Sequence, residues 1–318
     1  MEELDLLFLI KQGETMDKIL VTGGVGYLGQ WVVKELEKHY KVVVADLNLP
    51  NYETTPGTIY EKIDLKNSLE LDTLLNGIQA IVHLAAIPRP VGYRAENVFE
   101  NNMVTTFNIV EAAIRSNVKK IVFSSSGSAL GFAYSFTNMI PDYMPIDEEH
   151  PLKPQDSYGL SKAFGEDILE AATIRSGIST ISLRPTTVIV PSDYEERVLQ
   201  MLTTEQETEN RMDVPDVIEG LNGGNEKQTA ILAYVDARDY AQAVLLALQN
   251  TDIKHDRFFI SADDAMSREP ISKAFPKIFP GSEAVASKLT GIESPVSSEK
   301  AKRILGYKPQ YSWRNILK

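Results

Sequence analysis

The sequence predicts an α/β fold with a doubly wound parallel sheet and a small C-terminal lobe. Short β-branched runs alternate with longer helical patterns, which is typical of parallel strands joined by crossover helices. Several of these runs are apolar at every position, as expected when helices cover both faces of the sheet. A glycine-rich turn joins the first run to the first helical pattern, and that junction is typical of the Rossmann type of doubly wound sheet.

The predicted elements follow one another in a regular order. The clearest strands are 18–22, 41–46, 80–84, 120–124 and 179–184. Between them, apolar residues recur at four-residue spacing, as in Leu28, Val32 and Leu36, which indicates helices with one buried stripe. The composition becomes strongly acidic after Pro191, and a strand and helix pattern resumes near residue 231.

This pattern divides the chain. We expect residues 16–190 to form the main domain and residues 231–262 to return to it. Residues 191–230 and 263–318 would form the small lobe, with a substrate cleft between lobe and sheet.

Composition excludes several functional classes. The 318 residues include 43% hydrophobic ones, enough for a large core, and carry a net charge of −12, which disfavours nucleic acid and membrane partners. There is no cysteine, so disulfides, thiolate nucleophiles and Cys-ligated zinc are excluded. The histidines show no metal-ligand spacing, and we expect no metal site; they are His39, His83, His150 and His255.

The N-terminal residues 1–15 precede the first predicted strand. Their one apolar run, 6–10, follows acidic residues rather than the basic region of a signal peptide, and it is too short to span a bilayer. We therefore expect a flexible extension and, with no export or anchoring signal elsewhere, a cytoplasmic protein.

The glycine turn TGGVGYLG predicts a dinucleotide site. Gly23 permits the tight turn, Gly26 lets the backbone approach a pyrophosphate, and Gly29 lets the helix pack closely on the strand. Glycines also serve ordinary turns. The strand before and the helix after this triad favour the nucleotide interpretation.

Acidic and small residues extend this site. Asp46 lies 23 residues after Gly23, close to the spacing of the acid that binds the adenosine ribose, and no arginine follows it, which favours NAD over NADP. Asp64 is placed to reach the adenine edge. His83 is expected to be a satisfied core histidine, followed by a small apolar stretch beside the cofactor, Leu84, Ala85 and Ala86.

Tyr158 and Lys162 stand four residues apart in a predicted helix and share one face. An ammonium near a phenol lowers the phenol pKa, and such a phenol can exchange a proton with a substrate hydroxyl. Such pairs are also common on solvated helices, but here one follows a nucleotide turn. Lys162 can also bind the nicotinamide ribose.

A serine cluster follows the strand 120–124, where open α/β sheets place their ligands. One hydroxyl there could bind the substrate oxygen, and we select Ser126. The alternatives Ser124, Ser125 and Ser128 remain open.

These residues resemble the extended short-chain dehydrogenase/reductases, also called the NAD-dependent epimerase/dehydratase family. TGGVGYLG is similar to its TGxxGxxG, HLAA to its fourth-strand motif, SSS to its serine strand and YGLSK to its YxxxK. LRPTTVIVPS, YVDARDYAQAV and LGYKP resemble later family segments, so nearly the whole chain is covered.

The resemblance implies a set of site residues. Ser126, Tyr158, Lys162 and Asn102 would be catalytic, with Asn102 supporting the lysine through backbone or water. The NAD-binding residues would be Gly23, Gly26, Tyr27, Leu28, Gly29, Asp46, Asp64, Leu65, Leu84, Ala85, Ala86, Tyr158, Lys162 and Pro185. Thr105 departs from the glycine usual at its position, which concerns helix packing rather than chemistry.

The expected activity is hydride transfer between NAD and a secondary alcohol or ketone of a sugar-like substrate. A nucleotide-sugar 4-epimerase or dehydratase with tightly bound NAD is the alternative, because Arg238, Arg257 and Arg268 could meet a phosphate. A non-catalytic NAD sensor is a third interpretation, disfavoured by the complete Ser/Tyr/Lys set. The resemblance also implies a homodimer.

Overall fold

The computed structural model describes residues 18–206 and 231–316. A seven-stranded sheet with the order β3-β2-β1-β4-β5-β6-β9 forms its centre, and every neighbouring pair is parallel. Its strands are β1 (Lys18–Thr22), β2 (Lys41–Asp46), β3 (Ile59–Lys62), β4 (Ala80–His83), β5 (Lys120–Ser124), β6 (Ser179–Pro185) and β9 (His255–Ile260). The predicted doubly wound parallel sheet is confirmed.

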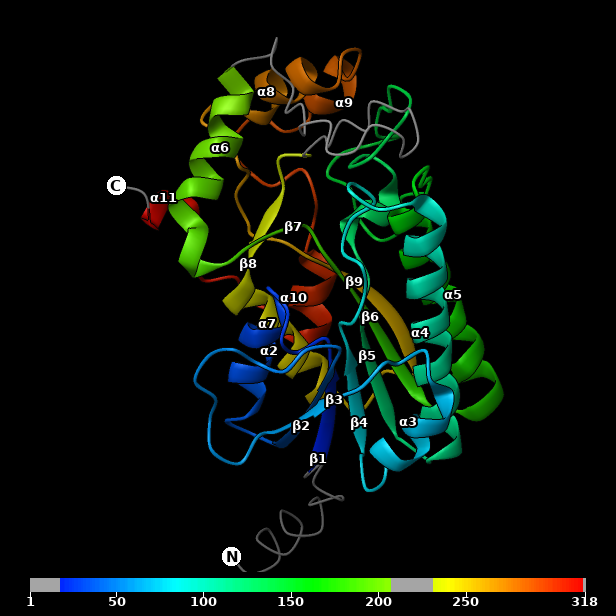
Figure 1. Ribbon diagram of the computed structural model, residues 1–318. Helices are drawn as coiled ribbons and strands as arrows, with labels where there is room; N and C mark the ends of the chain where they lie inside the picture. Colours follow the sequence, from blue (N-terminus) through cyan, green and yellow to red (C-terminus); the bar gives the residue numbers. More distant parts are fainter. Residues whose placement is uncertain (1–17, 207–230, 317–318) are drawn as a thin grey trace, which may run out of the picture.

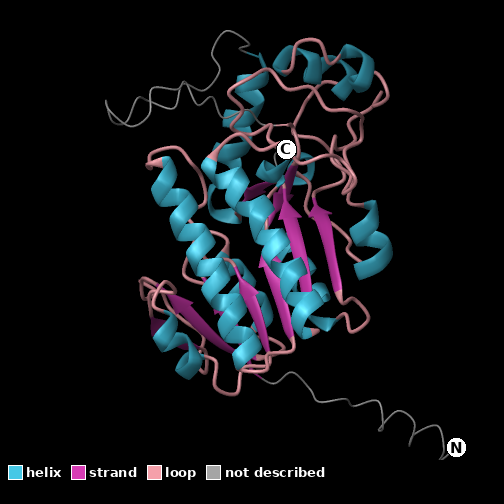
Figure 2. Cartoon of the chain, turned by 90° about the vertical axis from the view of Figure 1, so that its right-hand side faces the viewer, coloured by secondary structure: helices cyan, strands magenta, loops and turns pink. Residues whose placement is uncertain are grey.

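Helices cover both faces of the sheet (Figures 1 and 2). One face packs against α2 (Gly29–Leu36), α7 (Ala237–Gln249) and α10 (Glu299–Leu305). The other packs against α3 (Ser68–Leu74), α4 (Ala95–Arg115) and α5 (Ser157–Ser176). Side chains alternate between the two cores, because Ile19 and Val21 belong to the first and Leu20 to the second.

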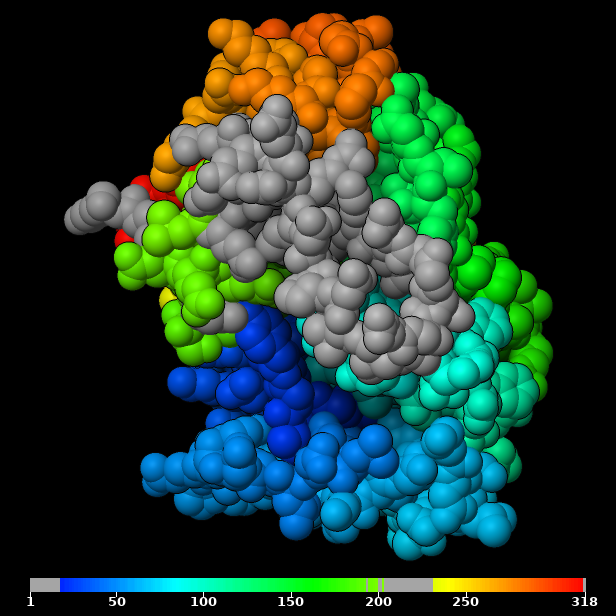
Figure 3. All heavy atoms as spheres, turned by 45° about the horizontal axis from the view of Figure 1, so that its top comes forward, coloured from blue at the N-terminus to red at the C-terminus, as the bar shows by residue number. Residues whose placement is uncertain are grey.

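The remaining elements lie beyond the carboxyl ends of the strands (Figure 1). A small sheet pairs β7 (Thr187–Ile189) with β8 (Tyr234–Asp236). The other elements are η1 (Gly127–Leu130), η2 (Pro191–Asp193), α6 (Tyr194–Gln206), α8 (Ile271–Ile278), α9 (Glu283–Ala286) and α11 (Trp313–Ile316). In the space-filling view, the segment that holds α8 and α9 lies at the opposite end from the N-terminal strands (Figure 3).

The structure departs from the sequence predictions in a few places. The edge strand β3 was not predicted, because its burial pattern is mostly exposed and it carries no apolar run. β4 ends at His83 rather than Leu84, and β6 extends to Pro185. The N-terminal extension 1–15 and residues 207–230 of the acidic segment lie outside the described residues.

No helix within 18–206 and 231–316 combines the length and the apolar character that crossing a membrane requires. The same ranges contain no group of three or more His, Asp or Glu residues arranged to hold a metal ion.

Candidate active site

The candidate site lies where the strand order reverses. From β1 the chain builds the sheet outward through β2 and β3, and from β4 it builds in the opposite direction through β5 and β6. Thr22 is in register with His83, and His83 with Phe123, so the carboxyl ends of these three strands meet at one level. Ligands of open α/β sheets bind at such a switch point.

The glycine turn between β1 and α2 is closely packed. Gly23 has φ +71°, and a Cβ there would stand 2.7 Å from the backbone of Ala85. A Cβ on Gly29 would lie 2.1 Å from the Gly23 carbonyl oxygen. Leu28 stands at the N-cap of helix α2, and its side chain makes no capping hydrogen bond. The amide end of this helix is therefore suited to bind an anion. These residues fit a dinucleotide pyrophosphate.

Asp46, at the end of β2, is tied to the glycine turn. Its Oδ2 accepts a 3.1 Å hydrogen bond from the Val25 amide, and its Oδ1 accepts one of 3.2 Å from the Asn48 amide. The carboxylate is therefore held next to the turn, as a ribose ligand requires.

The other cofactor candidates lie at the same edge of the sheet. Asp64 is exposed, and its Oδ1 accepts from the Lys66 amide at 2.9 Å. Leu65 is buried, and its side chain belongs to the core beneath α4, so only its backbone remains for a ligand. The other candidates at this edge are the exposed Tyr27, the partly buried Leu28, Leu84, Ala85 and Ala86 and the buried Gly29 and Pro185, with Gly26 in the turn itself.

Tyr158 and Lys162 lie on α5, both nearly buried, with exposed fractions of 9% and 4%. Asp156 caps this helix by accepting from the amides of Tyr158 and Gly159 at 2.9 and 2.8 Å. A Cβ on Gly159 would stand 2.7 Å from the Ser128 carbonyl oxygen, so glycine lets α5 approach the serine turn. Lys162 Nζ lies 5.7 Å from the centre of the Tyr158 ring.

The pKa of Tyr158 runs against the sequence expectation. Burial raises it to about 12, the hydrogen bond with Ser126 opposes the rise, and the nearby Asp156 charge adds to it. Burial also lowers the pKa of Lys162 to about 7, which the Glu166 charge opposes. Without a bound ligand, the loss of solvation therefore has a larger effect on the Tyr158 pKa than the lowering expected from the Lys162 ammonium. Both groups lose solvation because both are buried.

The serines after β5 have distinct partners. Ser124 Oγ accepts from the Tyr240 hydroxyl at 2.8 Å, and Ser125 Oγ donates to Glu166 at 2.5 Å. Ser126 is the serine whose side chain is hydrogen-bonded to Tyr158, and its Oγ also accepts from the Ser128 amide at 3.0 Å. Of the alternatives left open by the sequence, Ser126 therefore lies with the phenol.

Asn102 is buried on α4. Its Oδ1 accepts from the Ile87 amide at 2.8 Å, and its Nδ2 donates to the Ile87 carbonyl and to Ser161 Oγ at 3.1 and 3.0 Å. The side chain thus joins the loop after β4 to α5 at the residue before Lys162. The Thr105 hydroxyl donates a 2.8 Å hydrogen bond to the Asn101 carbonyl oxygen, one turn earlier in the same helix. Threonine therefore fits the helix at the position where the family usually has glycine.

His83 lies beneath the site and is buried as expected. Its ring nitrogens are hydrogen-bonded to Thr22 and Thr106 at 2.7 and 3.1 Å. Burial and the Lys162 charge lower its pKa to about 3, so it stays neutral.

Sequence reasoning missed three neighbours of the site. The Tyr134 ring meets the Tyr158 ring edge-on at 6.5 Å, and Tyr240 and Glu166 hold the serine turn. Glu166 could have been found from its four-residue spacing after Lys162. Tyr134 and Tyr240 carry no local signal, because a loop and a distant helix bring them in.

The three arginines considered for a phosphate already have partners within the protein. Arg238 pairs with Asp236 at 2.8 Å and stacks on Tyr311, and Arg257 pairs with Glu170 at 3.5 Å. Arg268 also has an interaction partner. Arg89 and Arg197 instead act electrostatically on Tyr134.

Residues 19–260 match the sequence profile of the NAD-dependent epimerase/dehydratase family. The chain belongs to this family. A uronate dehydrogenase of Pseudomonas putida is 32% identical over 170 residues, covering 53% of this chain and 60% of that protein. For a relative from Methanocaldococcus jannaschii, the match spans 54% of the relative's own length. A UDP-glucose 4-epimerase of Corynebacterium glutamicum is 27% identical over 322 residues, covering 93% of this chain and 92% of that protein.

A solved structure supports the family fold. A short-chain dehydrogenase/reductase superfamily protein of Agrobacterium tumefaciens, solved with bound NAD, superposes with a TM-score of 0.67 at 22% identity and covers 94% of both chains. This similarity shows that the family's Rossmann fold extends over nearly the whole of this chain.

Proposed function

We propose that this protein is an NAD-dependent oxidoreductase that transfers a hydride at a secondary alcohol or ketone of a sugar-like substrate. The observation that carries the proposal is the meeting of Ser126, Tyr158 and Lys162 at the same edge of the sheet as the glycine turn, in a chain of the epimerase/dehydratase family. NAD, when bound, supplies the hydride acceptor.

Each residue has a proposed role. Tyr158 moves the proton of the substrate hydroxyl, Ser126 holds the reacting oxygen, and Lys162 binds the nicotinamide ribose and favours the phenolate. The buried phenol needs that charge, because burial, with the Asp156 charge adding to it and the Ser126 hydrogen bond opposing it, raises the pKa of Tyr158 to about 12. Asn102 keeps the loop after β4 and α5 in place, as its bonds to Ile87 and Ser161 indicate.

Asp46 supports the choice of NAD over NADP. Its carboxylate, held by the Val25 and Asn48 amides, would accept from ribose hydroxyls and repel a 2′-phosphate. The glycine turn and the uncapped start of α2 would take the pyrophosphate.

The test is a substrate panel followed by the absorbance of NADH. Galacturonate, glucose and UDP-glucose are each incubated with the protein, with and without added NAD. We expect steady NADH formation with at least one sugar. A protein that binds NAD but neither reduces it nor converts any sugar would contradict the proposal and support an NAD sensor.

A nucleotide-sugar 4-epimerase is the second candidate. The match to a UDP-glucose 4-epimerase over 93% of this chain favours it, and an epimerase would use the same Ser126, Tyr158 and Lys162. Conversion of UDP-glucose without net NADH would establish it in place of the dehydrogenase.

The charge near the phenol favours an acidic sugar among the candidates. Burial and the Tyr158 and Asp156 charges raise the pKa of Tyr134, and Arg89 and Arg197 oppose that rise, so two arginines lie within electrostatic reach of the ring that packs edge-on against Tyr158. A uronate dehydrogenase is among the relatives. We expect galacturonate to react faster than glucose in the panel.

A homodimer through α4 and α5 is part of the proposal. These helices lie side by side on the outside of the sheet (Figure 2). They expose Phe107, Phe164 and Ile174 at 51%, 44% and 80%. Replacing Phe107 and Phe164 by glutamate should halve the mass measured by light scattering, whereas an unchanged mass would contradict this interface.

Two further expectations remain proposals. Residues 191–230 and 263–318 would form the substrate lobe, and their described parts, 191–206 and 263–316, support this by their place beyond the strand ends (Figure 1). A cytoplasmic location is tested by cell fractionation.

A further inference from the structure

The turn that follows β5 is held by two buried side chains outside the Ser126, Tyr158 and Lys162 set. Lys162 Nζ donates to the Ser124 carbonyl oxygen at 2.7 Å. The hydroxyl of the same serine accepts from Tyr240, and the next residue, Ser125, donates to Glu166. Ser124 is therefore engaged from both α5 and α7, and Ser125 from α5.

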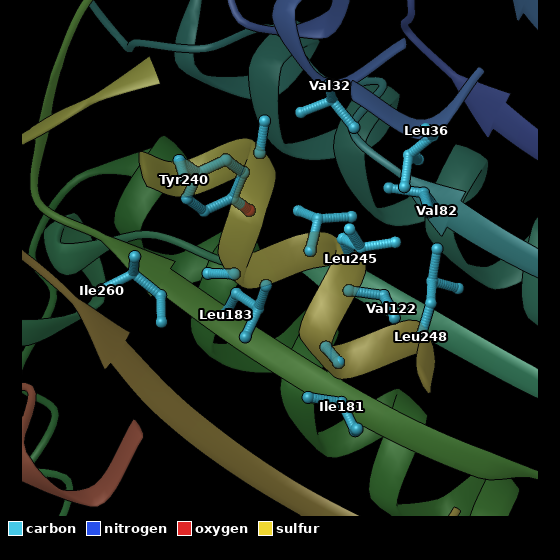
Figure 4. Close-up of a cluster of buried hydrophobic side chains, with 14 of the residues drawn as sticks. Val32, Leu36, Val82, Val122, Ile181, Leu183, Tyr240, Leu245, Leu248 and Ile260 are labelled. Carbon is cyan, nitrogen blue, oxygen red and sulfur yellow. The ribbon is translucent and has the colours of Figure 1, made fainter. Parts of the chain in front are cut away.

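Tyr240 holds the turn from one face of the sheet. It lies on α7, has no exposed surface, and its ring packs in the core among residues such as Leu183 and Ile260 (Figure 4). Its hydroxyl reaches Ser124 Oγ at 2.8 Å. Because the ring is packed on all sides, this hydroxyl gives Ser124 a fixed orientation.

Glu166 holds the turn from the other face. Its carboxylate accepts from Arg184 on β6 in a bidentate pair, with Nε and Nη2 at 2.8 and 2.7 Å, and neither side chain is more than 2% exposed. Ser125 Oγ donates to the same carboxylate at 2.5 Å. A buried bidentate pair fixes both partners in space, so Ser125 is anchored rigidly.

We propose that Tyr240 and Glu166 are positioning residues for the hydride transfer: they fix both sides of the turn, so that the Ser124 carbonyl holds the Lys162 ammonium and the Ser126 hydroxyl stays with Tyr158. This rests on the proposed function, which gives Lys162 and Ser126 their roles. Neither Tyr240 nor Glu166 touches the reacting atoms.

Glu166 has a second effect through its charge. The ionisable groups that interact with Lys162 are Glu166 and Tyr158 on α5 and His83 on β4, and Tyr240 on α7 binds the same Ser124 as Lys162. His83 is neutral, and burial raises the pKa of Tyr240 well above its usual value, so that phenol is neutral as well. Glu166 supplies the negative charge that favours the ammonium. Its neutralisation should lower the pKa of Lys162 further.

The first experiment removes one hydrogen bond at a time. Tyr240→Phe, Ser125→Ala and their double variant are compared with wild type, using the sugar that the panel shows to be turned over fastest. Tyr307→Phe is the matched control, because Tyr307 lies in the same core and its hydroxyl donates to the Ser261 carbonyl at 3.2 Å, away from the turn.

Each single variant should lose about fivefold to tenfold in kcat, with KM changed by less than about twofold, since one buried hydrogen bond is lost and substrate contacts remain. The double variant should lose less than the product of the single effects, because both act on one turn. Variants that keep the kcat of the Tyr307→Phe control would overturn the proposal.

The second experiment does not depend on activity. The titration of the Lys162 ε-carbon is followed by NMR without NAD in wild type, Glu166→Gln and Glu166→Asp. The midpoint should fall in Glu166→Gln and recover towards wild type in Glu166→Asp, which keeps the charge. An unchanged midpoint in a folded Glu166→Gln would overturn the role of Glu166. If Glu166→Gln does not fold, the kcat of Ser125→Ala tests the role of Glu166 instead, because this variant removes the hydrogen bond between Ser125 and Glu166.

The two experiments separate the proposal from the proposed function. A wild type that turns over no sugar defeats the function, while the Lys162 titration still reports on Glu166. A wild type that is active while the positioning variants match the control defeats only the proposal.

Discussion

Lys162 on α5 donates a 2.7 Å hydrogen bond to the carbonyl oxygen of Ser124, the last residue of β5. This bond connects the helix that carries the candidate acid/base to the strand whose end carries the serine turn. It also holds an ammonium in a buried place, where desolvation lowers its pKa to about 7.

The first prediction concerns stability. With a folded pKa of about 7 against 10.5 for an ordinary lysine, the unfolded chain binds more protons between these values, so the Lys162 contribution to the free energy of unfolding rises with pH there. Below about pH 7 both states are charged and the folded state bears the full desolvation cost. Lys162→Met should therefore raise the free energy of unfolding most at low pH.

Urea unfolding without NAD at about pH 6 and about pH 10.5 measures this difference. The gain of Lys162→Met over wild type should be on the order of a few kcal/mol larger at the lower pH, since each pKa unit corresponds to about 1.4 kcal/mol. If the gain in free energy of unfolding were equal at the two pH values, the burial of the Lys162 ammonium would be contradicted.

The second prediction concerns the phenol. Tyr158→Phe keeps the ring against Tyr134 but removes the hydroxyl that is hydrogen-bonded to Ser126. Turnover should fall by about 100-fold to 10,000-fold, while NAD binding, measured by isothermal titration, stays nearly unchanged. Equal turnover in the variant would remove Tyr158 from the mechanism.

The third prediction concerns the cofactor. Asp46→Asn removes the charge that the Val25 and Asn48 amides hold at the end of β2. The dissociation constant for NAD should rise about tenfold and the preference over NADP should shrink, because a charged hydrogen bond to ribose is lost. Asp72→Asn, which removes an exposed carboxylate paired with Arg115, is the control and should leave both constants unchanged.

The fourth prediction concerns the glycine turn. Gly29→Ala would place a Cβ 2.1 Å from the Gly23 carbonyl oxygen, so the helix and the turn must separate. Both NAD affinity and thermal stability should fall. Gly177→Ala, at the left-handed end of α5 where a Cβ would meet no atom of residues 18–206 or 231–316 within 4 Å, should lower stability by about 1 kcal/mol through backbone strain and leave NAD affinity unchanged. A Gly29→Ala variant that binds NAD normally would contradict the close packing of the turn.

Local patterns in the sequence account for much of the fold. Continuous apolar runs mark the buried strands β1, β2, β4 and β5, because strands covered on both faces have no polar side. The exposed edge strand β3 escapes the same reasoning, since nothing in its local pattern requires burial.

By itself, the sequence determined the doubly wound sheet, the glycine turn and the tyrosine–lysine spacing, because each depends on neighbours along the chain. Only the tertiary structure decided that Ser126 rather than Ser124 or Ser125 lies with Tyr158, and that burial raises rather than lowers the pKa of that phenol. Those outcomes depend on Tyr240 and Glu166, which reach the turn from two helices on opposite faces of the sheet, and on the loss of water there. Contacts between distant segments and solvent exclusion are properties of the packed chain, which no local pattern encodes.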